Sequence, residues 1–329
     1  MSAVTPDTLP QPDTLIKPAA PLSPLVLGVR RFRRHKMAMF GLGLLVVLVL
    51  YISFAGFFVR GYCAPLGREL SQEAWANCND TSLKLQPPSG EHLFGTDVIG
   101  RDIFARTIYG GQISLLIGVS AAIMEVILGA LVGSIAAYYG GWIDSVLMRF
   151  TEAMLNIPSL FLLIIGAHFF GNRLPSFNLL GRELSGGVIL MILIIGATSW
   201  MYLARIVRAN VLSLRERDYI SAARALGASD SRLIFTHLLP NTIAPLVVSA
   251  TLGVANAILA EAYASFLGLG VRGATATWGN MLDGAYQYLE TAPWLWFFPG
   301  TMILLTVLGI NFVGDGLRDA LDPYSTKHL

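Results

Sequence analysis

Six long apolar runs constrain the fold of this chain more than any other feature. Each approaches or exceeds the roughly 20 residues that a helix needs to cross the hydrocarbon core of a bilayer. They cover residues 37–59, 112–139, about 145–170, 184–204, 239–271 and 291–313. Only 13% of the 329 residues are charged, well below the level typical of a soluble domain. The sequence therefore predicts an all-α integral membrane protein with six transmembrane helices.

The distribution of Lys and Arg predicts which side of the membrane the chain ends occupy. A basic cluster directly precedes the first run, at Arg30, Arg31, Arg33, Arg34 and Lys36. Positive residues favour the cytoplasm, so we expect the N-terminus inside, and six spans return the C-terminus to the same side. The first run exceeds the roughly 7–15 apolar residues of a signal peptide, so a retained anchor is the better interpretation.

Changes between apolar and polar composition divide the chain into five predicted regions. They are a disordered cytoplasmic tail at 1–27, a basic segment with the first span at 28–60, an extracytoplasmic loop at 61–110, a five-span core at 111–315 that includes a polar loop at 209–240, and a cytoplasmic C-terminal tail at 316–329. Within the outer loop, Thr96 or Asp97 is expected to cap a short interfacial helix, with Ile99 and Ile103 on one face.

The sequence gives little support to several kinds of site chemistry. The five histidines are scattered, so we expect no metal site. No phosphate-binding loop of the form G-x-x-x-x-G-K-[ST] occurs, so we expect no cofactor on this chain. A net charge of +2 gives no reason to expect a nucleic-acid partner. Cys63 and Cys78 both fall in the outer loop, where a disulfide and two unlinked thiols are the alternative interpretations.

The segment between the fourth and fifth runs carries clear helix punctuation. Residues 213–216 (Ser-Leu-Arg-Glu) match a capping box, which predicts a helix that starts near Leu214. This helix is expected to continue through Ala222 and Ala223. Gly227 suits the left-handed position that follows a helix, so the helix is expected to end there.

A second short helix is predicted directly after Gly227. Ser229 can cap it, and Asp230 is favourable in its first turn. The helix is expected to end near Leu238 or Leu239, where Pro240 can begin the fifth span. Two capped helices that meet at a glycine are more than a plain connector needs. We therefore expect a partner outside the bilayer to dock here.

This loop resembles the EAA loop of bacterial ABC-transporter permease subunits, whose pattern is Glu-Ala-Ala, three residues, Gly, and later Leu-Pro. The matching residues are Ala222, Ala223, Gly227, Leu239 and Pro240, whereas Ser221 stands where the family has Glu. Two further stretches, 94–102 (FGTDVIGRD) and 314–323 (GDGLRDALDP), look like signatures of the dipeptide/oligopeptide-type permeases. The short N-terminus and the single long first outer loop look more like the "C" permease of the pair than the "B" one.

The resemblance implies a permease subunit that forms half of an ATP-driven import pathway for di- or oligopeptides in the inner membrane. It implies a homologous second permease, two cytoplasmic ATPase subunits that hold ATP and Mg, and an extracytoplasmic substrate-binding protein. It assigns docking of the ATPase to a coupling loop that contains Asp218, Ser221, Ala222, Ala223, Gly227, Leu239 and Pro240. Nickel chelates, glutathione and oligosaccharides are alternative solutes.

Ionisable residues inside spans are costly and often functional. Glu125 and Glu261 lie within predicted spans. One interpretation places them at the pore or at the seam with the second permease, and the other is a structural pairing with a polar neighbour. They would also suit a secondary transporter driven by an ion gradient, but such a transporter leaves the capped cytoplasmic helices unexplained. A membrane-embedded enzyme or a non-transporting scaffold are further alternatives.

Overall fold

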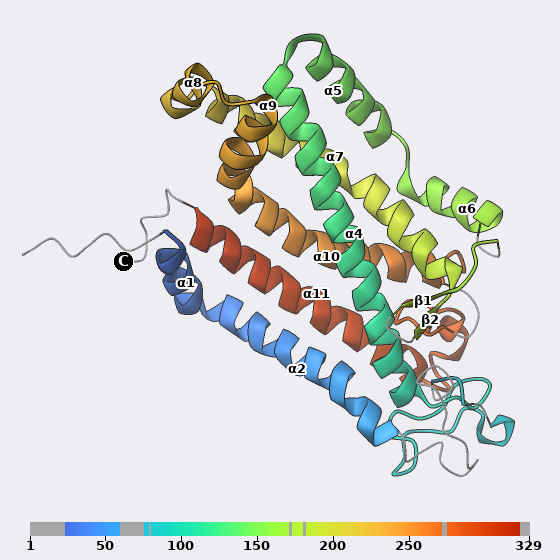
Figure 1. The fold of residues 1–329 in the computed structure, drawn as a ribbon. Helices are drawn as coiled ribbons and strands as arrows, with labels where there is room; N and C mark the ends of the chain where they lie inside the picture. Colours follow the sequence, from blue (N-terminus) through green and yellow to red (C-terminus); the bar gives the residue numbers. More distant parts are fainter. Residues whose placement is uncertain are drawn as a thin grey trace, which may run out of the picture.

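The computed structural model describes residues 24–59, 76–78, 80–170, 173–179, 182–271 and 275–322, and it is almost entirely helical (Figure 1). Within these residues, five helical stretches are long and apolar enough to cross a membrane. Their helices are α2 (Lys36–Val59), α4 (Ile103–Tyr139), α7 (Gly186–Arg215), α10 (Ile243–Phe266) and α11 (Trp294–Leu321). All five confirm apolar runs that the sequence assigns to the membrane.

Shorter elements connect or flank these helices. They are α1 (Pro24–Arg34), η2 (Thr81–Leu83), α5 (Gly141–Leu155), α6 (Ser159–Phe170), the antiparallel strands β1 (Phe177–Leu179) and β2 (Arg182–Leu184), α8 (Asp218–Ala225), α9 (Asp230–Arg232), η3 (Leu233–Leu238), η4 (Leu239–Thr242) and η5 (Ala285–Tyr288). The helix α1 begins at Pro24, inside the tail predicted to be disordered, and the remainder of that tail lies outside the described residues.

The third predicted span is not one straight helix, and this prediction is corrected. It consists of α5 and α6, whose axes differ by 77° across a short break. The break ends at Pro158, which has no backbone N–H and disfavours a helical conformation at the preceding residue. The Asn156 side chain donates to the Glu152 carbonyl oxygen at 2.7 Å and so satisfies an acceptor that the interrupted helix leaves free. The pair counts as a sixth span if it crosses as one unit.

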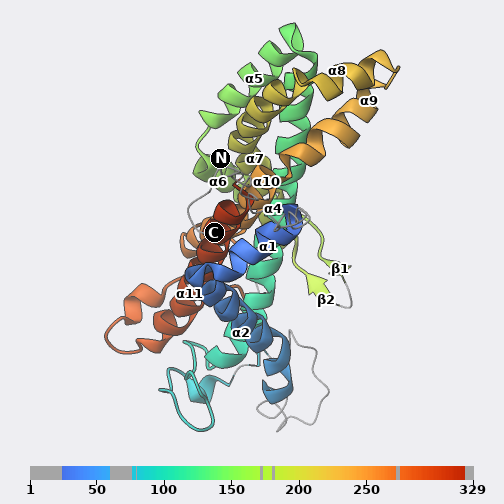
Figure 2. The same cartoon turned by 90° about the vertical axis from the view of Figure 1, so that its left-hand side faces the viewer.

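The long helices run between two ends of the molecule. One end, called here the α8 end, carries α1, α8, α9 and the last turns of α11, whereas the opposite η5 end carries residues 80–102, the two strands and η5 (Figures 1 and 2). At the α8 end, Arg31 Nη1 donates to the Asp322 carbonyl oxygen at 3.0 Å. The helices nearest the two chain ends therefore lie on the same side of the bundle.

The helix α4 is central and packs most closely on α7. The contact depends on two glycines spaced four residues apart. A β-carbon at Gly129 would lie 2.9 Å from the Leu203 side chain, and one at Gly133 would collide with the Ala204 carbonyl oxygen. Small residues at this spacing let helix backbones approach each other closely.

The helix α4 also begins earlier than predicted. Asp102, rather than Thr96 or Asp97, caps it by accepting from the Ala105 N–H at 2.9 Å, and the helix runs unbroken to Tyr139. The prediction of a separate interfacial helix is therefore wrong, and the predicted boundary at residue 110 falls inside α4. The boundary predicted at residue 316 likewise falls inside α11.

Candidate functional site

The helix α8 is anchored to the bundle by Ile220. This side chain is fully buried in a cluster with Val207 and Val211 of α7 and Leu233 of η3. Removing an isoleucine side chain from water contributes about 2 kcal/mol. The preceding residue, Tyr219, is exposed. Thus one face of α8 packs against the protein and the other remains available.

The turn after α8 is a complete Schellman motif. Gly227 has a left-handed backbone conformation with φ of 85°. Its N–H donates to the Arg224 carbonyl oxygen at 3.0 Å, and the Ala228 N–H donates to the Ala223 carbonyl oxygen at 3.1 Å. These two bonds define the motif and satisfy carbonyl groups at the helix end. The prediction that Gly227 follows the end of a helix is confirmed.

The next helix starts as predicted but does not stop before the fifth span. Ser229 Oγ accepts from the Arg232 N–H at 3.4 Å, and Asp230 lies in the first turn. The chain then remains helical through a π turn in η3 and a 3-10 turn in η4 into α10. Pro240 explains the irregular turns, because it offers no N–H to the Thr236 carbonyl in a regular α-helix.

The capping-box prediction is wrong. The helix α7 continues through Leu214 to Arg215, and α8 starts at Asp218. Ser213 therefore lies inside α7 and not at the start of a helix. The apolar residues of α7 that precede Ser213 pack against the core, and such tertiary packing overrides a local capping signal.

The residues predicted to form the coupling loop fall into two groups in the structure. Those that are exposed are Asp218, Ser221, Ala222, Gly227 and Pro240. Those that are half-buried against the Ile220 cluster are Ala223 and Leu239. The sequence interpretation missed Leu226, which is 89% exposed at the tip of the loop. A large apolar residue directly before the helix-ending glycine was the available signal.

A polar network ties this loop to the end of α4. The Tyr138 hydroxyl donates to Asp230 Oδ1 at 2.6 Å, and the Arg224 guanidinium lies 5.8 Å from the centre of the Tyr138 ring. Arg215 Nη1 also donates to the Ala137 carbonyl oxygen at 2.8 Å. The segment that carries α8 and α9 therefore contacts the end of α4 as well as α7.

Glu261 lies entirely inside the subunit. Its side chain is 0% exposed, and its oxygens accept from Ser265 Oγ at 2.7 Å and from Ser114 Oγ at 3.2 Å. Ser114 Oγ in turn accepts from the Trp278 N–H at 3.1 Å. The carboxylate thus joins α4, α10 and the segment that follows α10. A role at the pore or seam stays a prediction for this residue.

Glu125 lies nearer the surface of the bundle, between α4 and α10. It is 8% exposed, and Oε1 accepts from Ser249 Oγ at 3.2 Å. Next to it, a shallow apolar groove of about 420 Å³ is lined by α4, α10 and α11 and bordered by the exposed Ile123 and Ile127. Glu125 is therefore better placed than Glu261 to reach a neighbouring subunit, and this role also stays a prediction.

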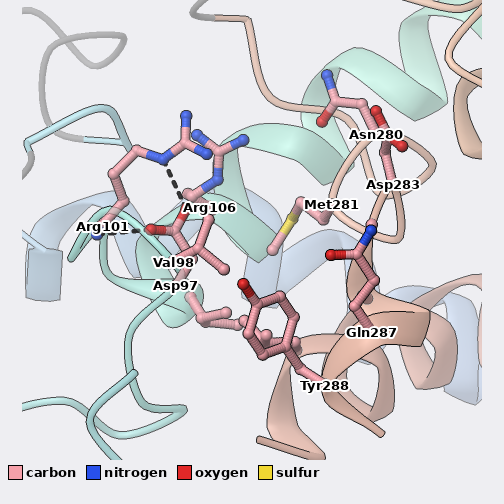
Figure 3. Close-up of a pocket in the computed structure, with 13 residues that line it drawn as sticks. Asp97, Val98, Arg101, Arg106, Asn280, Met281, Asp283, Gln287 and Tyr288 are labelled. Atoms are coloured by element: carbon pink, nitrogen blue, oxygen red, sulfur yellow. Dashed lines mark hydrogen bonds and ion pairs between the residues drawn. The ribbon is translucent and has the colours of Figure 1, made fainter. Parts of the chain in front are cut away.

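A polar pocket of about 220 Å³ opens at the η5 end (Figure 3). Side chains of residues 97–106 face side chains of residues 280–288 across it. Asp97 Oδ2 accepts from Arg101 Nε at 2.6 Å, and Arg106 Nη1 donates to Asn77 Oδ1 at 3.0 Å. The pocket therefore combines two guanidinium groups and the Asp97 carboxylate on one wall with the Asp283 carboxylate and neutral hydrogen-bonding groups on the opposite wall.

The sequence signature at 94–102 builds the outer wall of this pocket. Gly95 and Gly100 have φ of 75° and 82°, and a β-carbon at Gly100 would collide with the Asp80 carbonyl oxygen. Asp102 caps α4 and also lies 2.8 Å from His92 Nδ1 through its second oxygen. The glycines and Asp102 of the signature are therefore needed to fold the segment that leads into α4. The disulfide between Cys63 and Cys78, one of the two alternatives, involves Cys63, which lies outside the described residues, whereas Cys78 lies within them.

Two family models match this chain. A family model described as binding-protein-dependent transport system inner membrane component matches residues 129–326. A second, described as the N-terminal TM domain of oligopeptide transport permease C, matches residues 23–88. A solved structure titled as inward-facing conformations of the MetNI methionine ABC transporter superposes with a TM-score of 0.48 and 21% identity, over 65% of this chain and 94% of that chain.

Two relatives match nearly the whole chain. The dipeptide transport system permease protein of Alkalihalophilus pseudofirmus is 40% identical over 302 residues, which covers 92% of this chain and 90% of the relative. The oligopeptide transport system permease protein of Bacillus subtilis is 40% identical over 297 residues, which covers 90% and 88%. The chain therefore belongs to the binding-protein-dependent transport system inner membrane component family, and it is a multi-pass inner-membrane permease subunit of an ABC importer.

Proposed function

We propose that this permease imports di- or oligopeptides by alternating access, as half of a pathway shared with a homologous second permease. The names of the two relatives support peptides as the solute. The basic cluster before α2 supports an orientation with both chain ends in the cytoplasm, because positive residues favour that side. In this orientation the η5 end, with the polar pocket of Figure 3, faces an extracytoplasmic binding protein that delivers the peptide.

The cytoplasmic α8 end docks a separate ATPase subunit. The observation that carries this proposal is the exposure of Leu226, at 89%, on a loop whose fold is fixed by Ile220 and by the turn at Gly227. A solvated loop gains nothing from an exposed leucine, whereas burying one in a partner contributes about 1.5–3 kcal/mol. The second ATPase subunit docks on the second permease, and the two ATPase subunits hold ATP and Mg.

Transport then follows from mechanical coupling between the two ends. Closure of the ATPase dimer moves α8, and the contact between Tyr138 and Asp230 transmits the movement to α4 and α10. Such coupling requires that the docked partner has different contacts in the inward-open and outward-open states. Glu125 and the groove beside it lie where the second permease can pack against α4 and α10.

Two leucines provide a matched test of docking. Leu226 and Leu289 each follow the last turn of a short helix at opposite ends of the molecule, and both are exposed. We expect Leu226→Ala to lower co-purification of the ATPase subunits by about tenfold or more, since the buried side chain contributes about 1.5–3 kcal/mol. Leu289→Ala should leave it unchanged. Normal ATPase binding by the Leu226 variant contradicts the docking proposal.

The substrate is tested separately with the intact importer in proteoliposomes. We expect ATP-dependent accumulation of a labelled tripeptide when the binding protein is present, and no accumulation when Leu226→Ala is combined with limiting ATPase. If the intact importer accumulates a nickel chelate or glutathione but no peptide, the solute assignment is wrong while the docking assignment stands.

A further inference from the structure

A basic cavity lies at the α8 end, where α1 meets the last turns of α11. It measures about 300 Å³, and its walls include Arg31, Arg34, His35, Lys36 and Asp319. The two helices that form it are far apart in sequence but lie side by side in both views (Figures 1 and 2). The cavity is therefore a product of tertiary packing and not of one charged helix.

The positive charge of this cavity exceeds the negative charge that the described residues supply. Arg31 uses one N–H on the Asp322 carbonyl oxygen, at 3.0 Å, and His35 Nε2 lies 3.5 Å from Asp319 Oδ2. In the described part of the chain, no ion pair is formed by Arg34 or Lys36. Three permanently charged cations thus line a cavity with one carboxylate, which favours an anion as its occupant.

The position of the cavity specifies what kind of anion fits. It lies at the bend between α1 and the spanning helix α2, where the His35 side chain accepts from the Ala38 N–H at 3.0 Å. Immediately beyond the cavity, Met37 and Phe40 of α2 are 49% and 60% exposed. Cationic groups that border an exposed apolar helix surface match a molecule with an anionic head and hydrocarbon tails.

We propose that this cavity binds the phosphate group of an anionic phospholipid of the cytoplasmic leaflet. Arg34 donates to two phosphate oxygens, because its guanidinium fork matches that geometry, while Lys36 acts as a point charge. The acyl chains lie along α2 beside Met37 and Phe40. Basic pockets at the cytoplasmic ends of membrane helices suit such headgroups. Since α1 and α11 both line the cavity, the bound lipid lies against both helices.

The test uses the complete importer, purified and analysed by native mass spectrometry after titration with phosphatidylglycerol or with phosphatidylcholine of the same acyl chains. The two variants are Arg34→Gln/Lys36→Gln, which removes two cavity charges, and Arg30→Gln/Arg33→Gln, which removes two exposed charges of α1 outside the cavity. The net charge changes equally in both, so diffuse attraction to an anionic membrane falls equally.

We expect the cavity variant to lose about tenfold in phosphatidylglycerol binding, and the control variant to lose no more than about twofold. Phosphatidylcholine binding should be weak in every protein. Equal losses in the two variants, or equal retention of both lipids by the unmodified importer, would overturn the proposal. Displacement of the lipid by inorganic phosphate, at concentrations comparable to those of the lipid, would also overturn the proposal.

If the double variant does not assemble, Arg34→Lys replaces it. This change keeps the charge but removes the planar fork, and we expect a loss of about threefold to fivefold in phosphatidylglycerol binding. Unchanged binding by Arg34→Lys together with unchanged binding by Lys36→Gln contradicts the assignment.

Discussion

The glycine that ends α8 gives the most direct test of how the coupling loop is held. Gly227 has φ of 85°, and a β-carbon placed on it would meet no atom within 4 Å. Any effect of Gly227→Ala therefore comes from the backbone conformation and not from a steric clash. Holding an L-residue with a β-carbon in the left-handed region costs roughly 1–2 kcal/mol.

This conformational cost weakens docking, because the docked loop needs the left-handed turn at position 227. In the free permease the alanine variant can relax to another turn, which moves Leu226 away from its position. Docking of the ATPase must then restore the original turn, so binding weakens by up to roughly 1–2 kcal/mol, or about fivefold to thirtyfold. Asparagine tolerates the left-handed conformation better than alanine, so Gly227→Asn should recover most of the affinity.

A closely matched control lies at the end of the helix bundle opposite α8. Gly268 follows α10 with φ of 72° and open space around its β-carbon position. Its turn has the same Schellman bonds, because the Leu269 N–H donates to the Ala264 carbonyl oxygen at 2.9 Å. Gly268→Ala therefore introduces equal strain far from α8 and should leave ATPase affinity unchanged.

Affinity can be measured as the dissociation constant of ATPase subunits from permease in lipid nanodiscs, with thermal unfolding as a check on the fold. The expected order of affinity is unmodified protein, then Gly227→Asn, then Gly227→Ala, with Gly268→Ala equal to the unmodified protein. Two results would refute the reasoning: normal affinity of Gly227→Ala, or an equal loss in Gly268→Ala, which would mean that strain anywhere in the fold weakens docking.

Three further predictions concern the packing and the coupling path. Tyr138→Phe removes the hydrogen bond to Asp230, so we expect ATPase binding to persist while peptide uptake per ATP hydrolysed falls, and equal coupling ratios would count against this path. Gly133→Leu should abolish folded yield by separating α4 from α7, whereas Gly43→Leu, at an open position on α2, should not. Glu261→Ala should lower the free energy of unfolding by about 2–4 kcal/mol, because it leaves the buried hydroxyls of Ser114 and Ser265 without an acceptor. Glu261→Gln retains an acceptor and should cost less. If both variants unfold with the same free energy as the unmodified protein, the network is not structural.

Sequence reasoning succeeded where the physical cause is local. The turn at Gly227 and the cap at Ser229 depend on residues within a few positions of each other, and both are present. Apolar run length likewise located the spanning helices, because crossing a bilayer requires a continuous length of apolar residues. It could not detect the bend at Pro158, since hydropathy does not change when the direction of a helix changes.

Failures of sequence reasoning occurred where distant residues determine local structure. The start of α4 looks too polar for a spanning helix, but Arg106 is buried there because Asn77 accepts from its guanidinium. The capping box at Ser213 is overridden by the packing of α7. Similarly, the burial of Ile220 depends on Val207, Val211 and Leu233, which local sequence does not bring next to it, and this burial decides which face of α8 can dock.

The replacement of the expected glutamate by Ser221 can now be judged from the geometry. Ser221 is exposed, and the position of α8 is fixed by Ile220 on one side and by the turn at Gly227 on the other. Neither anchor uses the side chain at position 221, so serine leaves the loop folded. Asp218 lies one turn earlier, at the spacing that places two residues side by side on a helix surface. We therefore expect Asp218 to present a carboxylate to the docked ATPase near the position where the family carries its glutamate.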